Sequence, residues 1–211
     1  MSSCCAKTEF TGLSASYKRI LWFIIAINAV MFGVEMLAGI SAQSQALQAD
    51  ALDFLGDTLS YGISLWAIGK ALTVRSSAAL IKGISLLLMA IWVVGSTLYR
   101  IWVLNQPDAF TMGWVAIAAF SANMLSVLLL MRYRNGDANV RSVWLCSRND
   151  AIGNLVVLLA ASGVWYTDTP WPDLLTALIM ATLFLSSSWQ IIRQALAEKR
   201  AAAAQLAESG S

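Results

Sequence analysis

The stretch QADALDFLGDTLS, residues Gln48–Ser60, is the most informative part of this sequence. It carries three carboxylates, Asp50, Asp53 and Asp57, at spacings of three and four residues. In a helix of about 3.6 residues per turn, these spacings place all three within roughly 60° of one another on one face. The surrounding residues are apolar enough to cross a bilayer, where a lone carboxylate costs at least a few kcal/mol. Three of them on one face therefore require a partner, a proton or a cation.

The composition of the whole chain identifies a membrane protein. Of its 211 residues, 58% are hydrophobic and only 12% are charged, whereas a soluble domain averages about 25% charged residues. Apolar runs of about 20 residues, long enough to cross a bilayer, recur along the chain. We therefore predict an all-α, polytopic membrane protein. We expect no nucleic-acid partner, since the sequence has no basic block or aromatic-basic face, and three Cys with no His exclude a disulfide framework.

The apolar segments predict six transmembrane helices, at about residues 20–40, 46–69, 78–103, 111–133, 142–165 and 173–196. This pattern divides the chain into a short N-terminal tail (1–17), a six-helix transmembrane domain (18–196) and a short C-terminal tail (197–211). The first 17 residues lack the apolar core and cleavage site of a signal peptide. We expect the first segment to remain as a membrane anchor.

Basic residues indicate the orientation in the membrane. They gather before the first predicted helix, in the second and fourth loops, and after the sixth helix, while the other three loops carry none. By the positive-inside rule, both termini are predicted to be cytoplasmic. We expect a multi-pass protein of a bacterial-type inner, or plasma, membrane. The residues concerned are Lys7, Lys18, Arg19, Lys70, Arg75, Lys82, Arg132, Arg134, Arg141, Arg193, Lys199 and Arg200.

A second polar cluster lies in the fifth predicted helix. Cys146 and Asp150 are four residues apart and share a face, which Asn154 continues one turn further. If the second and fifth helices are neighbours, Cys146 and Asp150 lie near mid-membrane depth together with Asp53 and Asp57. One thiolate and three carboxylates would form a roughly tetrahedral site suited to zinc, and the sulfur would admit softer ions such as cadmium.

Several roles remain open at this level. Asp50 and Asn154 are secondary candidates as metal ligands, and Asp50 also suits a polar gate at the outer mouth of the site. Cys146 is either a ligand or a small buried hydrophobe. The membrane carboxylates have a structural alternative as partners of buried amides or of basic residues. Asn28 and Glu35 suit either a packing hydrogen bond or a proton-accessible group. Cys4 and Cys5 suit a soft-metal trap, an acylation site or a plain tail. Arg148 and Lys82 are the basic candidates for structural partners of the carboxylates.

The sequence resembles the cation diffusion facilitator (cation efflux) family over nearly all of its six-helix part. The runs LWFIIAINAVMFGVEMLAGISAQS and AQSQALQADALDFLGDTLSYGISLWA are similar to that family's first and second helices. The runs SRNDAIGNLVVLLAASGVW and WPDLLTALIMATLFL are similar to its fifth and sixth helices. Members of the family are similar six-helix, proton-coupled exporters of divalent metals, and they are usually dimeric. Carried over, the ligands would be Asp53, Asp57, Cys146 and Asp150.

The sequence departs from the family pattern in two places. Cys146 occupies a position where the family usually has His or Asp. The family's cytoplasmic domain of ferredoxin-like type is expected to be absent, because the chain ends soon after the sixth predicted helix. Dimerisation through that domain and metal sensing by it are therefore not expected.

Together these features predict a divalent metal exporter. Zinc is the first candidate, followed by cadmium, cobalt and other transition metals, with the ion exchanged for protons at a mid-membrane site. The alternative is a membrane-embedded metal sensor or accessory subunit that binds metal without moving it. An enzyme is not expected, since the chain has no Ser-His, HExxH or Gly-rich phosphate signature and no His as general base. We expect no cofactor; the partners would be divalent metal ions, protons as counter-ion, the lipid bilayer and a second copy in a homodimer.

Overall fold

A computed structural model describes residues 14–67, 72–103, 106–134 and 138–209. These residues form helices and short connections, and no strand occurs among them. The N-terminal tail up to residue 13, with Cys4 and Cys5, lies outside the described residues, as does Lys70. The helices are α1 (Ala15–Ser41), α2 (Gln45–Ala67), α3 (Leu72–Val103), α4 (Ala109–Leu130), the 3₁₀ helix η1 (Met131–Tyr133), α5 (Ala138–Thr167) and α6 (Trp171–Ser209).

The six predicted helices are confirmed, with several ends displaced outward. The largest difference is in α6, which continues beyond residue 196 to Ser209. Its last turns contain AAAAQLAES, and Ala has the highest helix propensity of all residues, so the helix persists past the apolar segment. The residues predicted as a C-terminal tail therefore mostly extend the last helix.

Five of the described helices are long and apolar enough to cross a membrane, namely α1, α3, α4, α5 and α6. α2 is the exception because it carries Asp50, Asp53 and Asp57. It is nevertheless deeply placed, since it packs against α1, α3, α5 and α6. The helix with the most unfavourable composition for lipid is therefore shielded by four neighbours.

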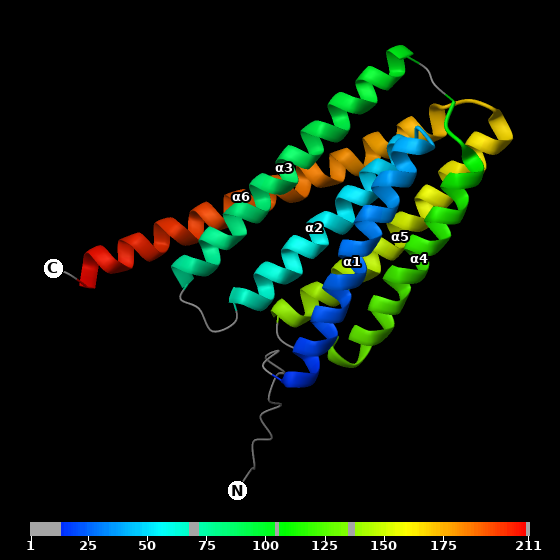
Figure 1. Cartoon of the computed structure of the whole chain (residues 1–211). Coiled ribbons are helices and arrows are strands. Elements are labelled where there is room, and N and C mark those ends of the chain that lie inside the picture. Colours follow the sequence, from blue (N-terminus) through cyan, green and yellow to red (C-terminus); the bar gives the residue numbers. More distant parts are fainter. Residues whose placement is uncertain (1–13, 68–71, 104–105, 135–137, 210–211) are drawn as a thin grey trace, which may run out of the picture.

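The helices associate in three close pairs: α1 with α2, α4 with α5, and α3 with α6. The first two pairs are sequential hairpins, whereas α3 and α6 are far apart in the sequence. Figure 1 shows α3 and α6 lying together on one side and inclined to the other four helices. α2 also packs against α5, which confirms the neighbour relation on which the predicted site depends.

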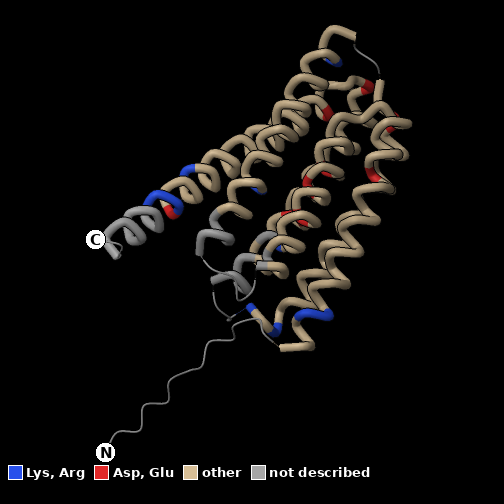
Figure 2. Tube along the Cα trace, turned by 60° about the vertical axis from the view of Figure 1, so that its left-hand side comes forward, with Lys and Arg blue, Asp and Glu red and all other residues tan. Residues whose placement is uncertain are grey.

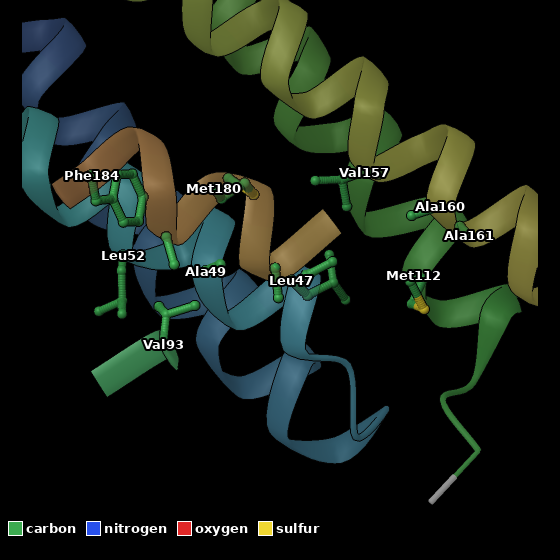
Figure 3. Close-up of a cluster of buried hydrophobic side chains, with 14 of the residues drawn as sticks. Leu47, Ala49, Leu52, Val93, Met112, Val157, Ala160, Ala161, Met180 and Phe184 are labelled. Carbon is green, nitrogen blue, oxygen red and sulfur yellow. The ribbon is translucent and has the colours of Figure 1, made fainter. Parts of the chain in front are cut away.

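A core of small and medium apolar side chains joins the helices (Figure 3). Fully buried alanines permit close approach of α2 to its neighbours, as small residues do at helix contacts in membranes. The larger members of the core fill the space between the pairs. The labelled residues are Leu47, Ala49, Leu52, Val93, Met112, Val157, Ala160, Ala161, Met180 and Phe184.

The described basic residues gather mostly toward one end of the bundle. Figure 2 shows most of the described Lys and Arg toward the end of the bundle where α1 begins and along the last part of α6. Arg100 lies in the last turn of α3. This distribution is the one from which the positive-inside rule predicts cytoplasmic termini. The orientation itself stays a prediction.

Gly39 lies where α1 turns into α2, and its lack of a side chain permits the close contact. A Cβ at this position would lie 2.9 Å from Gln48 Cγ and 3.0 Å from Gln48 N. We expect Gly39→Ala to destabilise the protein by about 1–3 kcal/mol through overpacking. The matched control is Gly33→Ala on the same helix, where a Cβ meets nothing within 4 Å; it should stabilise by about 0.5–1 kcal/mol. Denaturant unfolding in detergent micelles compares them, and equal stability of the two variants would contradict this packing.

Candidate metal site

Three of the four predicted ligands meet between α2 and α5. Asp53 and Asp57 lie one turn apart on α2, and Asp150 of α5 is in side-chain contact with both. Asp57 is buried, with 9% of its surface exposed, while Asp53 and Asp150 are partly buried. The helix packing therefore brings together carboxylates that are nearly 100 residues apart in the sequence.

The fourth predicted ligand, Cys146, lies on α5 one turn before Asp150. Its side chain lies outside the described part of the structure, so its role as a ligand stays a prediction. Among the side chains that are described, no three Cys, Asp or Glu residues are arranged as a ready metal cage. The carboxylates meet in pairs, and binding a cation between them would require them to converge.

Asp57 also connects the site to α1 and α3. Asn28 of α1 donates a long hydrogen bond of 3.5 Å from Nδ2 to Asp57 Oδ2. Tyr61, one turn further along α2, contacts Asp57, and the cation of Lys82 on α3 attracts it. Four helices thus contribute to the surroundings of this single carboxylate.

The structure does not support Arg148 as a structural partner of these carboxylates. Arg148 is exposed, lies 5.5 Å from the centre of the Trp144 ring and donates to Asn149 at 3.2 Å. Its guanidinium group is thereby directed along its own helix and away from α2.

A second polar group lies on the other side of Asp53 from Asp57. Asp50 is buried, with 1% exposed, and its Oδ2 accepts a 2.7 Å hydrogen bond from Nδ2 of Asn154. Asn123 of α4 in turn donates to Asn154 Oδ1 at 2.9 Å. An amide from α5 thus holds the Asp50 carboxylate inside the bundle, and the role of Asp50 as a polar gate stays a prediction.

Glu35 belongs to this second group. It is completely buried on α1 and acts electrostatically on Asp50 and Asp53. Of the two roles left open for Asn28 and Glu35, the hydrogen bond between helices is the one that Asn28 makes, to Asp57 of α2. The two residues share a helix face but serve different polar groups.

No role was predicted for Asn123, an amide in the fourth apolar segment. An amide within an otherwise apolar helix could have indicated such a role, because polar groups at membrane depth usually have a partner. Asp173 was also missed. It lies at the start of α6, and its contacts belong to residues more than 120 positions away.

A family model described as the cation efflux transmembrane domain matches residues 21–198, which include α2 to α5, most of α1 and α6, and every described side chain of the site. The chain belongs to the cation efflux family. The predicted family is thereby confirmed, and the protein is a multi-pass protein of the plasma membrane.

Similar cation efflux proteins come from several bacteria. The chain is 24% identical over 191 residues to the metal cation efflux system protein CzcD of Cupriavidus metallidurans. It is 26% identical over 193 residues to the zinc transporter ZitB of Escherichia coli, and 26% identical over 200 residues to a cadmium, cobalt and zinc/H(+)-K(+) antiporter of Bacillus subtilis. These alignments cover 85%, 85% and 86% of this chain. The chain spans 60% to 63% of the length of these relatives.

Proposed function

We propose that this cation efflux protein exports divalent metal ions, with zinc as the principal cargo and cadmium and cobalt as further candidates. It acts as a secondary transporter, with metal and protons exchanged at the site between α2 and α5. The observation that supports this proposal is the contact of Asp150 with both Asp53 and Asp57 inside a helical membrane bundle. The names of the similar proteins, which include zinc, cadmium and cobalt, favour the same class of cargo.

The chemistry of the site favours a divalent cation. Three like-charged carboxylates in a poorly solvated interior repel one another unless protons or a cation neutralise them. Carboxylate oxygens bind zinc at about 2.0–2.2 Å, so a small inward movement of Asp53, Asp57 and Asp150 provides three oxygen ligands. Cys146, one helical turn from Asp150, is proposed as the fourth ligand, and its sulfur would extend the selectivity to cadmium.

The same carboxylates explain why metal would be exchanged for protons. A metal ion binds deprotonated ligands, so its arrival expels the protons that neutralise the empty site. After the metal leaves, protons restore neutrality and lower the cost of returning an empty site through the membrane. Metal moves outward while protons move inward.

The outer surface of the bundle suits lipid. Large apolar side chains are strongly exposed on several helices, among them Leu88, Trp92, Trp102 and Leu159. In water such a surface would aggregate, whereas in a bilayer it faces acyl chains. We propose the lipid bilayer as one partner and a second copy of the chain, as a homodimer, as another.

Zinc added to inverted vesicles should turn their lumen alkaline. The purified chain is reconstituted with a pH dye in the lumen, with no imposed pH gradient and with a permeant anion that dissipates the membrane voltage. Because zinc enters an inverted vesicle in the export direction, exchange must remove protons from the lumen. The initial rates of zinc uptake and of the pH rise should increase together with zinc concentration.

The controls are protein-free vesicles and vesicles that contain Asp57→Asn. Neither should show zinc uptake above leakage nor a pH response. Zinc uptake by the unmodified chain without a pH change would rule out proton exchange and leave facilitated diffusion. Stoichiometric zinc binding without uptake would instead support the sensor or accessory-subunit alternative.

A further inference from the structure

Glu35 is a buried acid that the site between Asp57 and Asp150 does not use. None of its surface is exposed, and neither carboxylate oxygen makes a hydrogen bond of normal geometry with any described residue. The groups that act on it electrostatically are two further carboxylates, Asp50 and Asp53. An acid in these surroundings requires a proton or a cation, because no basic side chain among the described residues is seen to neutralise it.

The neighbours of Glu35 form a supported arrangement. Asp50 lies opposite Glu35 across the contact between α1 and α2. Asn154 donates to Asp50 at 2.7 Å, and Asn123 donates to Asn154 at 2.9 Å. Both amides are buried. The bond from Asn154 uses one oxygen of Asp50, and the carboxyl group of Glu35 lies against the Asp50 carboxyl group.

The pair Glu35 and Asp50 lies at a different depth in the bundle from the main site, nearer to the start of α2. Along α2, Asp50 precedes Asp53 by about 4.5 Å and Asp57 by about 10 Å, at about 1.5 Å per residue. It lies toward the start of α2, the end of the bundle away from most basic residues (Figure 2). Asp53 interacts with both the main site and the pair of acids. It contacts Asp150 of the main site and repels the charges of Asp50 and Glu35.

We propose that Glu35 and Asp50 form a second divalent-cation site, at which the ion is held after it leaves Asp57 and Asp150 and before it is released. This proposal rests on the proposed export function and specifies the route of the ion. Asn154 and Asn123 are positioning residues that orient Asp50. The ligands of this second site are all oxygens. It therefore lacks the preference for soft ions that the Cys146 sulfur would give to the first site.

Binding of radioactive zinc to the purified full chain in detergent tests this second site. The parent variant removes three of the four proposed ligands of the first site and the other thiols, through Asp57→Asn, Asp150→Asn, Cys146→Ser, Cys4→Ser and Cys5→Ser. We expect this parent still to bind zinc. Adding Glu35→Gln should weaken that binding at least about tenfold, since even loss of an outer-shell partner costs about 10- to 100-fold in metal affinity. Asp50→Asn should have the same effect.

The matched control is Glu198→Gln, the same substitution on α6 at a Glu that accepts a hydrogen bond from Gln194 on the same helix. It should leave zinc binding unchanged. A structural role of Glu35 would predict lower stability of the metal-free protein, whereas we expect Glu35→Gln to be at least as stable as its parent, because the new amide donates to Asp50. A parent that binds no zinc, or a Glu35→Gln variant with unchanged affinity, would overturn the second site. Failure of the export function shows separately, as absence of zinc flux through the unmodified chain.

Discussion

Asp57→Asn should reduce the initial rate of zinc uptake into inverted vesicles at least about tenfold while the protein still inserts and folds. Asp57 is contacted by Asp150 of α5 and Asn28 of α1, and it attracts Lys82 of α3. The substitution preserves shape but removes the negative charge at the point where these helices meet. Because loss of an outer-shell partner alone costs about 10- to 100-fold in metal affinity, loss of a ligand should cost no less.

A matched control separates this effect from a general loss of negative charge. Asp108→Asn changes an exposed carboxylate at the start of α4, where it accepts a hydrogen bond from Phe110 N at 3.2 Å. Asp108→Asn should transport zinc at the unmodified rate. Equal initial rates for Asp57→Asn and Asp108→Asn, with equal amounts of inserted protein, would remove the proposed site between α2 and α5.

Asp173→Ala should destabilise the bundle by at least about 3 kcal/mol, the largest stability effect that we expect from a single substitution. Asp173 is buried at the start of α6 and accepts three hydrogen bonds from the start of α2. The donors are Ser44 Oγ at 2.6 Å, Gln45 N at 2.7 Å and Ala46 N at 3.0 Å. The first backbone amides of a helix have no partner within the helix, and a buried donor left unpaired costs about 1–3 kcal/mol.

Ser44 connects this cap to α2 itself. Its hydroxyl oxygen accepts a 3.0 Å hydrogen bond from Leu47 N while its proton is donated to Asp173. The negative charge of Asp173 also complements the positive end of the α2 dipole. Loss of Asp173 should therefore loosen the start of α2, the helix that carries the candidate metal ligands, and reduce zinc flux together with stability.

Unfolding by a denaturing detergent, followed by tryptophan fluorescence, measures the effect of Asp173→Ala. Asp108→Ala is the control, because it removes the exposed cap of α4; loss of such a cap costs about 0.5–2 kcal/mol. Asp173→Asn keeps an acceptor oxygen without the charge, so its stability should lie between those of Asp173→Ala and Asp108→Ala. A stability of Asp173→Ala equal to that of Asp108→Ala would show that the hydrogen bonds to α2 contribute little.

The six helices, the acidic face of α2 and the family are determined by the sequence itself. A segment that crosses a bilayer must pair its backbone groups within a helix or a closed barrel, and apolar runs of about 20 residues have the length of a membrane-spanning helix. The helical repeat then places Asp50, Asp53 and Asp57 on one face without reference to any other segment. These properties are local, and for this reason composition and spacing were sufficient.

The tertiary structure alone decided which polar groups meet. Asp173 caps α2 from 127 to 129 residues away, and Asn123 reaches Asp50 only through Asn154. Glu35 meets Asp50 and Asn28 meets Asp57, although Glu35 and Asn28 lie on one face of α1. Such contacts depend on the rotation and inclination of each helix. In a membrane these are set by close packing of small residues between helices, and no local sequence pattern records them.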